Sequence, residues 1–236
     1  MKIEIWSDFV CPFCYIGKRR LENALADFPH KDAVMIEYRS YQLEPEAEHV
    51  PGKDFYETFS ELKGIPLHEV KTLNEQVADQ AKSLGLDYRF DTMQYANTFD
   101  AHRLFHFAER YGKGEEMTER LFFAYFTESE LLSDRQTLVK LAGDIGLDEE
   151  EAKRVLETKK FTQKVNEDIA VARQIGVQGV PFFVFNEKYA VSGAQPTSIF
   201  LKVLEKLWEE EGPNDKRHRG KKAKTSYCTD EGCIEQ

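Results

Sequence analysis

Two cysteines separated by two residues, Cys11 and Cys14, have the clearest capacity for chemistry in this sequence, and they lie in the run WSDFVCPFC at positions 6–14. A thiol attacks a disulfide only as its thiolate, so a redox-active cysteine needs surroundings that favour loss of the proton. The first turn of a helix supplies such surroundings through its unpaired backbone N–H groups and its dipole. We therefore predict that Cys11 attacks a substrate sulfur and that Cys14, one turn further and more buried, resolves the mixed disulfide.

A bare pair at this spacing also fits two different roles, because the cysteines could be buried structural residues or half of a zinc site. Residues 2–7 before the pair alternate polar and apolar types as a strand does, and residues 12–28 have helical periodicity. Pro12 suits the first position of a helix, where no N–H donor is needed. This position between a strand and a helix favours redox chemistry over the alternatives.

A second motif, Val180-Pro181, stands at the head of the apolar run FFVF at positions 182–185. Proline cannot donate to a strand ladder, so its presence at the start of a central strand needs a reason. It could be an ordinary trans proline that begins a strand. It could instead follow a cis bond, which would expose the Val180 backbone for pairing with an extended substrate beside the dithiol. The combination with the cysteine pair favours the cis bond.

The chain between these motifs is mostly helical in pattern. A strand over 33–41 completes a β-α-β opening with the first strand and helix. Six further helices are predicted over 54–63, 66–84, 94–111, 115–128, 134–145 and 148–159. The chain then returns to a helix over 161–175, strands over 182–185 and 189–192, and a closing helix over about 198–210.

This order predicts an α/β fold in which a helical insertion divides one sheet-containing domain. The core would comprise residues 1–52 and 160–211, and the insertion residues 53–159. Residues 212–236 are expected to form a flexible tail with a basic run and two further cysteines.

Composition excludes several classes of protein. The chain has 236 residues with 41% hydrophobic and 31% charged residues, which is typical of a soluble globular protein. A formal net charge of −10 argues against general nucleic-acid binding, which needs a basic surface. No apolar run approaches the roughly 20 residues of a membrane helix. The start of the sequence has no apolar export signal, so we expect a cytoplasmic protein without a membrane partner.

Four segments together resemble the DsbA family of the thioredoxin superfamily, and its FrnE-like branch in particular. They are DFVCPFC (8–14), NTFDAHRL (97–104), GVQGVPFF (176–183) and SGAQP (192–196). The resemblance covers about residues 1–211 and implies a thioredoxin-like core whose helical domain closes over the dithiol. It implies oxidation, reduction or isomerisation of protein or small-molecule disulfides, without a tightly bound cofactor. Glutathione or thioredoxin would be the cellular redox partner.

One residue departs from the family's periplasmic oxidant, which has histidine where this chain has Phe13. Histidine donates toward the thiolate and phenylalanine cannot, so we expect a less stabilised thiolate and a less oxidising couple. The expected reducing compartment points the same way, toward reductase or isomerase activity. We expect Pro12, Phe13, Val180 and Pro181 to contact the substrate.

Cys228 and Cys233 form a second close pair in the tail. Similar C-terminal pairs occur in some FrnE-like proteins, so a second redox pair that exchanges with Cys11 and Cys14 at high effective concentration is one possibility. A tail disulfide or two free thiols is the simpler one. All four cysteines could also bind zinc, although the proline and phenylalanine of the first pair argue against a zinc knuckle, and we predict no metal.

Several further residues allow two interpretations each. His102 either forms a substrate-binding wall over the dithiol or is a core histidine, and Arg103 beside it is expected at the surface. Asp8 either caps the first helix, which is the simpler interpretation, or assists proton transfer to Cys14. Trp6 is expected in the core. The stripe Phe122, Phe123, Tyr125 and Phe126 is expected in the core of the helical domain, with part of it available as an apolar surface.

Two competing functions remain open. Kappa-type glutathione transferases and related isomerases share the architecture implied by the resemblance, but they usually carry serine at the position of Cys11 and lack the resolving thiol. A zinc-held or chaperone-like binding module is the non-enzymatic alternative. The presence of both thiols favours the oxidoreductase.

Overall fold

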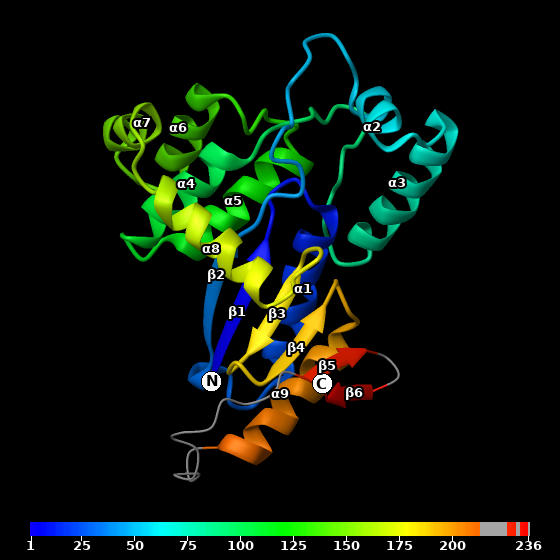
Figure 1. Cartoon of the computed structure of the whole chain (residues 1–236), viewed down its shortest axis with the longest axis vertical. Helices are drawn as coiled ribbons and strands as arrows, with labels where there is room; N and C mark the ends of the chain where they lie inside the picture. Colours follow the sequence, from blue (N-terminus) through cyan, green and yellow to red (C-terminus); the bar gives the residue numbers. More distant parts are fainter. Residues whose placement is uncertain (213–225, 230–231, 236) are drawn as a thin grey trace.

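The computed structural model describes residues 1–212, 226–229 and 232–235, and Figure 1 shows a sheet with helices on both faces and a helical part above it. The sheet has the strand order β2-β1-β3-β4-β5-β6. Strands β1 (Lys2–Ser7) and β2 (Met35–Ser40) are parallel, and helix α1 (Pro12–Asp27) connects them. This is the β-α-β opening that the sequence predicts.

The Val180-Pro181 motif directly precedes the strand that lies next to β1 in the sheet. Strand β3 (Phe182–Phe185) pairs antiparallel with β1 and forms a hairpin with β4 (Tyr189–Ser192). Asn186 and Glu187 in the connecting turn have positive φ angles of 47° and 56°. Positive φ at both central residues is the geometry whose twist matches a two-residue hairpin.

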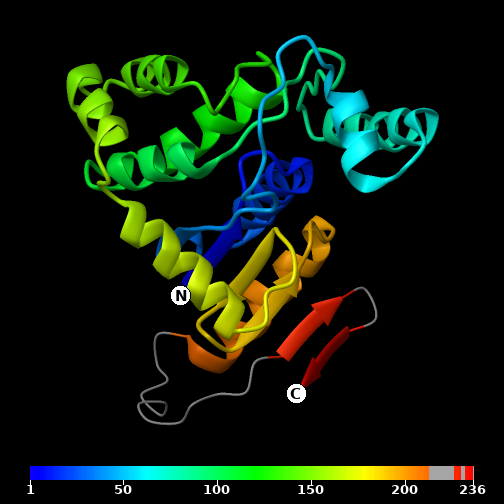
Figure 2. The ribbon, with the colours of Figure 1, turned by 45° about the horizontal axis from the view of Figure 1, so that its top comes forward.

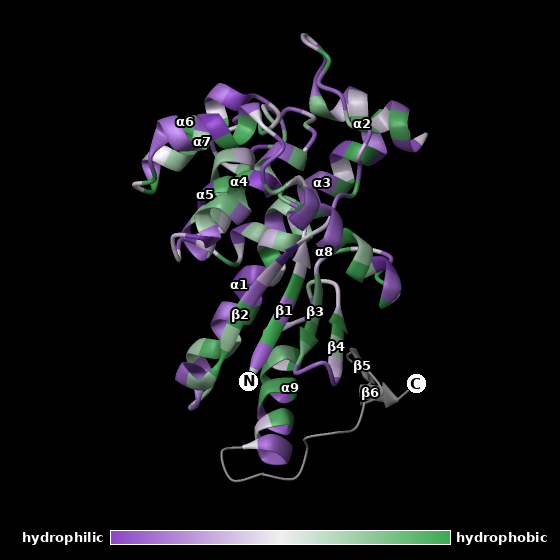
Figure 3. Cartoon of the chain, turned by 60° about the vertical axis from the view of Figure 1, so that its left-hand side comes forward, coloured by the Kyte–Doolittle hydropathy of each residue, from purple (hydrophilic) through white to green (hydrophobic). Residues whose placement is uncertain are grey.

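Strand β3 is buried on both faces, and its alternate side chains enter two different cores. Phe183 and Phe185 pack with residues of α1 and of α9 (Thr197–Glu211). Phe182 and Val184 face the opposite side, where they pack with Ala172 of α8 (Thr162–Gln174). A strand covered by helices on both faces has a continuous apolar sequence, which explains the run FFVF. In Figure 3 the central strands are largely hydrophobic, whereas the outlying helix α7 (Glu149–Glu157) is mostly hydrophilic.

The segment between β2 and α8 contains the remaining helices. They are α2 (Phe55–Lys63), α3 (Leu67–Lys82), α4 (Phe99–Glu109), α5 (Gly114–Phe126), α6 (Arg135–Asp144) and α7, and a short 3-10 turn (Lys31–Ala33) precedes β2. Figures 1 and 2 show α2 and α3 as a pair set apart from the cluster of α4 to α7. Among the described residues, no helix is long and apolar enough to cross a membrane.

Residue types near the helix starts predicted the beginnings of α6 and α7 correctly, but not the beginning of α4. The side chains of Asp134 and Asp148 accept hydrogen bonds from backbone N–H groups in the first turns of α6 and α7, as expected for helix caps. The helix predicted from residue 94 begins only at Phe99. Asn97 stops it, because its side-chain oxygen accepts from the Phe99 N–H at 2.9 Å and competes with a helical turn.

The segment beyond α9 adds two strands that the sequence analysis did not assign. Strand β5 (Ser226–Thr229) lies parallel to β4, and β6 (Gly232–Glu235) pairs antiparallel with β5, with Cys228 opposite Cys233 in the register. The expectation of a tail without regular elements is therefore wrong for these residues. Strand β5 is defined by pairing with the open edge of β4, and β6 by pairing with β5, rather than by apolar periodicity. The basic run at 216–224 lies outside the described residues.

Asp168 on α8 joins the helical part to the sheet, and its side chain is only 2% exposed. Its carboxylate lies 3.1 Å from His106 Nε2 of α4 and accepts from the Ser40 N–H of β2 at 3.1 Å. Arg39 of β2 lies 3.2 Å from the other carboxylate oxygen. The Trp6 indole N–H donates to the Asp168 carbonyl at 3.0 Å. Helices α4 and α8 and strands β1 and β2 thus meet at one buried ion-pair cluster.

The cluster shifts the titration of its members. Burial alone would lower the pKa of His106, but hydrogen bonds with Asp168 and Glu109 outweigh burial and raise that pKa above its ordinary value. Burial alone would raise the pKa of Asp168, but hydrogen bonds from His106 and the Ser40 N–H outweigh it and lower that pKa. The ion pairs of protonated His106 therefore stabilise the fold fully at pH values below about 6.5, the pKa of histidine in the unfolded chain. This stabilisation is lost as pH rises through the raised pKa of His106 in the folded protein.

Replacing Asp168 with asparagine should lower the free energy of unfolding by about 3 kcal/mol near pH 6, because a buried charge partner is lost. The difference from wild type should be smaller at about pH 8.5, because His106 loses its proton as pH rises through its raised pKa. Urea unfolding of both proteins at the two pH values measures this difference.

Asp87→Asn is the matched control, since Asp87 is 70% exposed and pairs only with Arg89 among the described residues. It should leave stability within about 0.5 kcal/mol of wild type. A difference between Asp168→Asn and wild type that stays constant with pH would contradict the role given to His106.

Candidate active site

Cys11 and Cys14 are both free thiols at the beginning of α1. Cys11 is the N-cap residue, and Pro12 is the first residue of the 16-residue helix. The Cys11 N–H donates to the Asp8 carbonyl at 3.0 Å, and the Cys14 N–H donates to the Cys11 carbonyl at 3.0 Å. These two turns hold Cys11 at the N-terminus of α1, which is the positive end of the helix dipole.

The structure brings the two sequence motifs together. The Cys11 thiol donates to the Val180 carbonyl over 3.4 Å, across a separation of 169 residues. The Val180–Pro181 peptide bond is cis. Gly17 allows this contact, because a Cβ atom there would lie 3.0 Å from Pro181 Cγ and 3.1 Å from Phe183 Cζ. Sequence reasoning missed Gly17, since nothing in its local sequence shows that another segment packs against it.

The two thiols have different surroundings although their exposures are nearly equal, at 4% for Cys11 and 3% for Cys14. Cys11 faces the Val180 carbonyl. The Cys14 sulfur accepts from the Asp8 N–H at 3.5 Å. Burial and hydrogen bonding with Cys11 raise the pKa of the Cys14 thiol well above its ordinary value, against a smaller lowering effect of the Ser7 hydroxyl and the Asp8 N–H. Cys14 therefore keeps its proton until a partner removes it.

The residues expected to contact a substrate differ in exposure. Phe13 is 41% exposed, so its ring is free to meet another molecule. Pro12 and Val180 are partly buried, and Pro181 is buried. The Tyr88 hydroxyl, from the loop between α3 and α4, donates to the Pro12 carbonyl at 2.8 Å and holds this turn in place. Tyr88 was not singled out by the sequence analysis, because an isolated tyrosine in a loop carries no local signal.

His102 and Asp8 lie together in the interior. Asp8 is completely buried and His102 is 1% exposed, with His102 Nε2 3.4 Å from Asp8 Oδ1. The other Asp8 oxygen accepts from the Leu43 N–H at 2.7 Å, and no side chain caps α1. The interpretation of Asp8 as a helix cap is therefore wrong, and His102 is a buried residue rather than an open wall over the dithiol.

Arg103, expected at the surface, is also buried, with 3% exposure. Its guanidinium group pairs with Asp100 at 2.6 Å and donates to carbonyl groups at the end of α7 and in the loop before α8. The expectation failed because α7 ends against α4, and its last carbonyls need donors that only a long cationic side chain can provide.

The aromatic stripe of α5 packs mostly inward, as expected. Phe122, Tyr125 and Phe126 are buried, and Phe123 is 42% exposed. The ring of Tyr15, next to Cys14 on α1, stacks on Phe122 with centroids 4.9 Å apart. The helical part thus covers the first turns of α1 with apolar rings and lowers the polarity around the dithiol.

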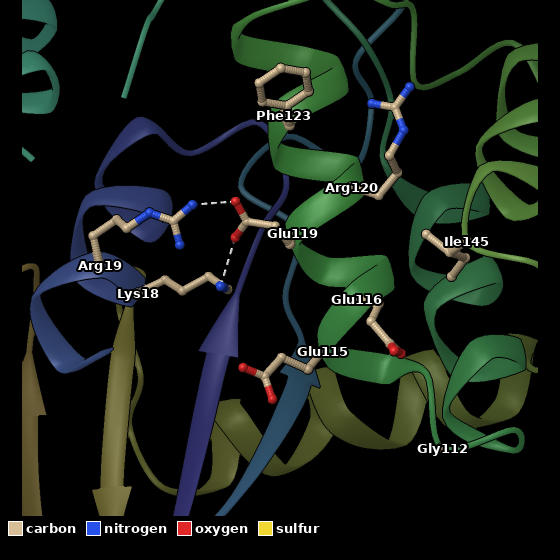
Figure 4. Close-up of a pocket in the computed structure, with 9 residues that line it drawn as sticks. All are labelled: Lys18, Arg19, Gly112, Glu115, Glu116, Glu119, Arg120, Phe123 and Ile145. Carbon is tan, nitrogen blue, oxygen red and sulfur yellow. Dashed lines mark hydrogen bonds and ion pairs between the residues drawn. The ribbon is translucent and has the colours of Figure 1, made fainter. Parts of the chain in front are cut away.

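A hollow of about 670 Å³ lies between α1 and α5 and contains neither cysteine. Figure 4 shows Lys18 and Arg19 of α1 directed toward Glu119 of α5. Glu119 accepts from Lys18 at 2.7 Å and from the Tyr15 hydroxyl at 2.5 Å, and it also pairs with Arg19. These bonds fasten the helical part to α1, so we assign the hollow a structural role rather than the reaction site.

No group of three or more histidine, cysteine or acidic residues within the described part of the chain is arranged to hold a metal ion. The side chains of Cys228 and Cys233 lie outside the part that the structure describes. The four-cysteine zinc hypothesis and the second redox pair therefore stay predictions.

Comparison with known proteins agrees with this geometry. A family model of the DSBA-like thioredoxin domain matches residues 2–205. A probable DsbA oxidoreductase from Streptomyces coelicolor is 34% identical, with a TM-score of 0.85 and coverage of 100% of this chain and 99% of that chain. The uncharacterised protein YwbO of Bacillus subtilis, strain 168, is 29% identical over 213 residues, which are 86% of this chain and 94% of that protein.

The cytosolic disulfide reductase DsbM of Pseudomonas aeruginosa, solved with GSH, is 16% identical, with a TM-score of 0.62 over 89% of this chain and 100% of that chain. At this identity the likeness concerns the fold alone. The family match spans most of the chain and includes both cysteines and the Val180–Pro181 bond. The chain therefore belongs to the family of DSBA-like thioredoxin domains.

Proposed function

We propose that this protein is a thiol–disulfide oxidoreductase that reduces or isomerises disulfides of proteins or small molecules. One observation carries the proposal: two free thiols at the start of α1 lie beside the cis Val180–Pro181 bond, with the Cys11 sulfur 3.4 Å from the Val180 carbonyl. This juxtaposition provides a nucleophile, a resolving thiol and a backbone edge for an extended substrate in one place.

The proposed reaction follows from the different surroundings of Cys11 and Cys14. The Cys11 thiolate attacks a substrate disulfide, and the substrate's second sulfur leaves with the electron pair of the broken bond. Cys14 then attacks Cys11 Sγ, which releases the remaining substrate sulfur and leaves a Cys11–Cys14 disulfide. Phe13, exposed between the two cysteines, and the partly buried Pro12 and Val180 would contact the substrate.

Turnover in the reducing direction needs an electron donor, for which we propose glutathione or a thioredoxin. Phe13 supports this direction, because it has no donor to stabilise a thiolate at Cys11. We propose a cytoplasmic location and the FrnE-like branch on the motifs of the sequence. The name of the 34% identical relative, a probable DsbA oxidoreductase, and that of DsbM, a cytosolic disulfide reductase, are in line with these proposals.

Replacing Cys11 with serine should reduce insulin-disulfide reduction to the uncatalysed rate, because the attacking sulfur is lost. Replacing Cys14 with serine should instead trap a mixed disulfide on Cys11, which mass spectrometry of the unreduced protein detects. The double variant Cys228→Ser/Cys233→Ser is the control for thiol content and measures whether the second pair takes part.

Activity that survives in Cys11→Ser would refute the proposed function. Glutathione conjugation by wild-type protein without formation of a Cys11–Cys14 disulfide would favour the transferase alternative. Zinc that copurifies in stoichiometric amount and is lost in the double variant would favour the zinc-held module.

Replacing Phe13 with histidine should make the couple more oxidising, since a donor near Cys11 stabilises the thiolate and hence the reduced state. We expect about a tenfold change in the equilibrium constant with glutathione, which corresponds to about 30 mV. Equilibration in glutathione buffers followed by thiol trapping measures it. Phe13→Leu, which adds no donor, should stay near wild type, and an equal shift in both variants would contradict the role given to the added donor.

A further inference from the structure

Arg20 on α1 is a partly buried cation that pairs with no carboxylate of the described residues. The other arginines in the described part of the chain either pair with a carboxylate or, like Arg110, Arg154 and Arg173, are exposed. Taking a charge out of water without a counter-charge is unfavourable, and burial accordingly lowers the pKa of Arg20. An arginine kept in this state needs a physical reason.

Two uncharged neighbours hold the Arg20 guanidinium group in place. It donates to the Ala194 carbonyl, in the loop between β4 and α9, and to Gln80 Oε1 of α3 at 3.2 Å. A guanidinium group has more N–H donors than these two contacts use, so it can bind a further acceptor. The structure therefore fixes a cation between α3 and the loop after β4 and leaves its charge unbalanced.

Arg20 lies on the side of α1 that meets the cis-proline. Gly17 is one turn before it and therefore on the same face of the helix. A Cβ atom at Gly17 would lie 3.0 Å from Pro181 Cγ and 3.6 Å from Ala194 Cβ. The carbonyl before Pro181 accepts from the Cys11 thiol at 3.4 Å. Since one helical turn rises about 5.4 Å, these contacts put the guanidinium group on the order of 10 Å from the Cys11 sulfur.

A carboxylate on the substrate would balance this charge, because a guanidinium group matches the two oxygens of a carboxylate. The chain has a net charge of −10 and so disfavours anions in general, which makes a local cation decisive for an anionic substrate. Glutathione is a small thiol that ends in carboxylates and is long enough to span this separation. Because the guanidinium group is partly buried between α3 and a loop, the end of a small molecule reaches it more easily than an internal residue of a protein chain does.

Resting on the proposed function, we propose that Arg20 binds a carboxylate of a small anionic disulfide of the glutathione class while Cys11 attacks the sulfur of the same half. The Cys11 thiolate forms a bond to that sulfur, the disulfide bond of the substrate breaks, and the other half leaves as a thiolate with the electron pair. Arg20 stays protonated and exchanges no electrons. Its contribution is selection, because the half whose carboxylate meets Arg20 is the half that Cys11 retains.

Oxidised glutathione and the disulfide of glutathione diethyl ester are the informative probes, because the ester lacks the negative charges and keeps the same sulfur atoms. Reduced protein is mixed with each probe, quenched in acid at intervals, and analysed by mass for the mixed disulfide and the closed disulfide. Their combined appearance gives the rate constant of attack by Cys11. Dithiothreitol under the same conditions gives the intrinsic reactivity of the two probes. Relative to dithiothreitol, wild-type protein should prefer oxidised glutathione by about tenfold.

Arg20→Gln should slow attack on oxidised glutathione about tenfold and leave attack on the ester unchanged, because the glutamine amide can donate hydrogen bonds but has no charge. Arg20→Lys, which keeps the charge, should retain part of the preference. Arg110→Gln is the matched control, since Arg110 is an exposed arginine at the end of α4 and its replacement changes the net charge equally. It should keep both rate constants of wild type.

The outcomes separate this inference from the proposed function. If wild-type protein forms neither a mixed nor a closed disulfide with either probe, the proposed function fails. If wild type reacts, and Arg20→Gln attacks oxidised glutathione as fast as wild type or is slowed equally with both probes, carboxylate binding by Arg20 is refuted. Should circular dichroism show that Arg20→Gln is unfolded, wild type alone decides, because a preference no larger than that of dithiothreitol would refute the inference.

Discussion

Helix α1 lies directly against Pro181 and Phe183 because Gly17 has no side chain. An added Cβ atom would lie 3.0 Å from the proline ring and 3.1 Å from the phenylalanine ring, so these neighbours would have to move by a few tenths of an ångström. This contact sets the distance between the start of α1 and the Val180–Pro181 bond, and so it places the Cys11 sulfur beside the Val180 carbonyl. The candidate site depends on this close approach of two segments far apart in the sequence.

The layers around α1 then determine the chemistry of the two thiols. Strands β1 and β3 lie on one side of α1. Helix α5 covers another side of α1, where the Phe122 ring stacks on Tyr15. Glu119, paired with Lys18 and Arg19, fastens that cover to α1. Enclosure of this kind disfavours charge, so an inner thiol stays protonated unless a base is supplied.

The difference between Cys11 and Cys14 comes from neighbours and not from exposure. Cys11 stands at the N-cap of α1, where its thiol faces the Val180 carbonyl. Cys14 lies one turn inside, where its sulfur receives only the weak Asp8 N–H contact and the influence of Ser7. Two residues of the same type thus have different neighbours, the Val180 carbonyl for Cys11 and the Asp8 N–H for Cys14.

The sequence by itself determined the parts of this protein that depend on local pattern. Apolar periodicity located β1, α1 and β3 to within a few residues, and residue types at positions 11–14 and 180–181 identified the dithiol and the proline motif. Only the tertiary structure decided that Asp8 bonds Leu43 rather than capping α1, that His102 and Arg103 are buried, and that β5 extends the sheet. Local periodicity records which face of an element is apolar. The partner that meets a polar side chain is set by packing between distant segments, which no local window of sequence contains.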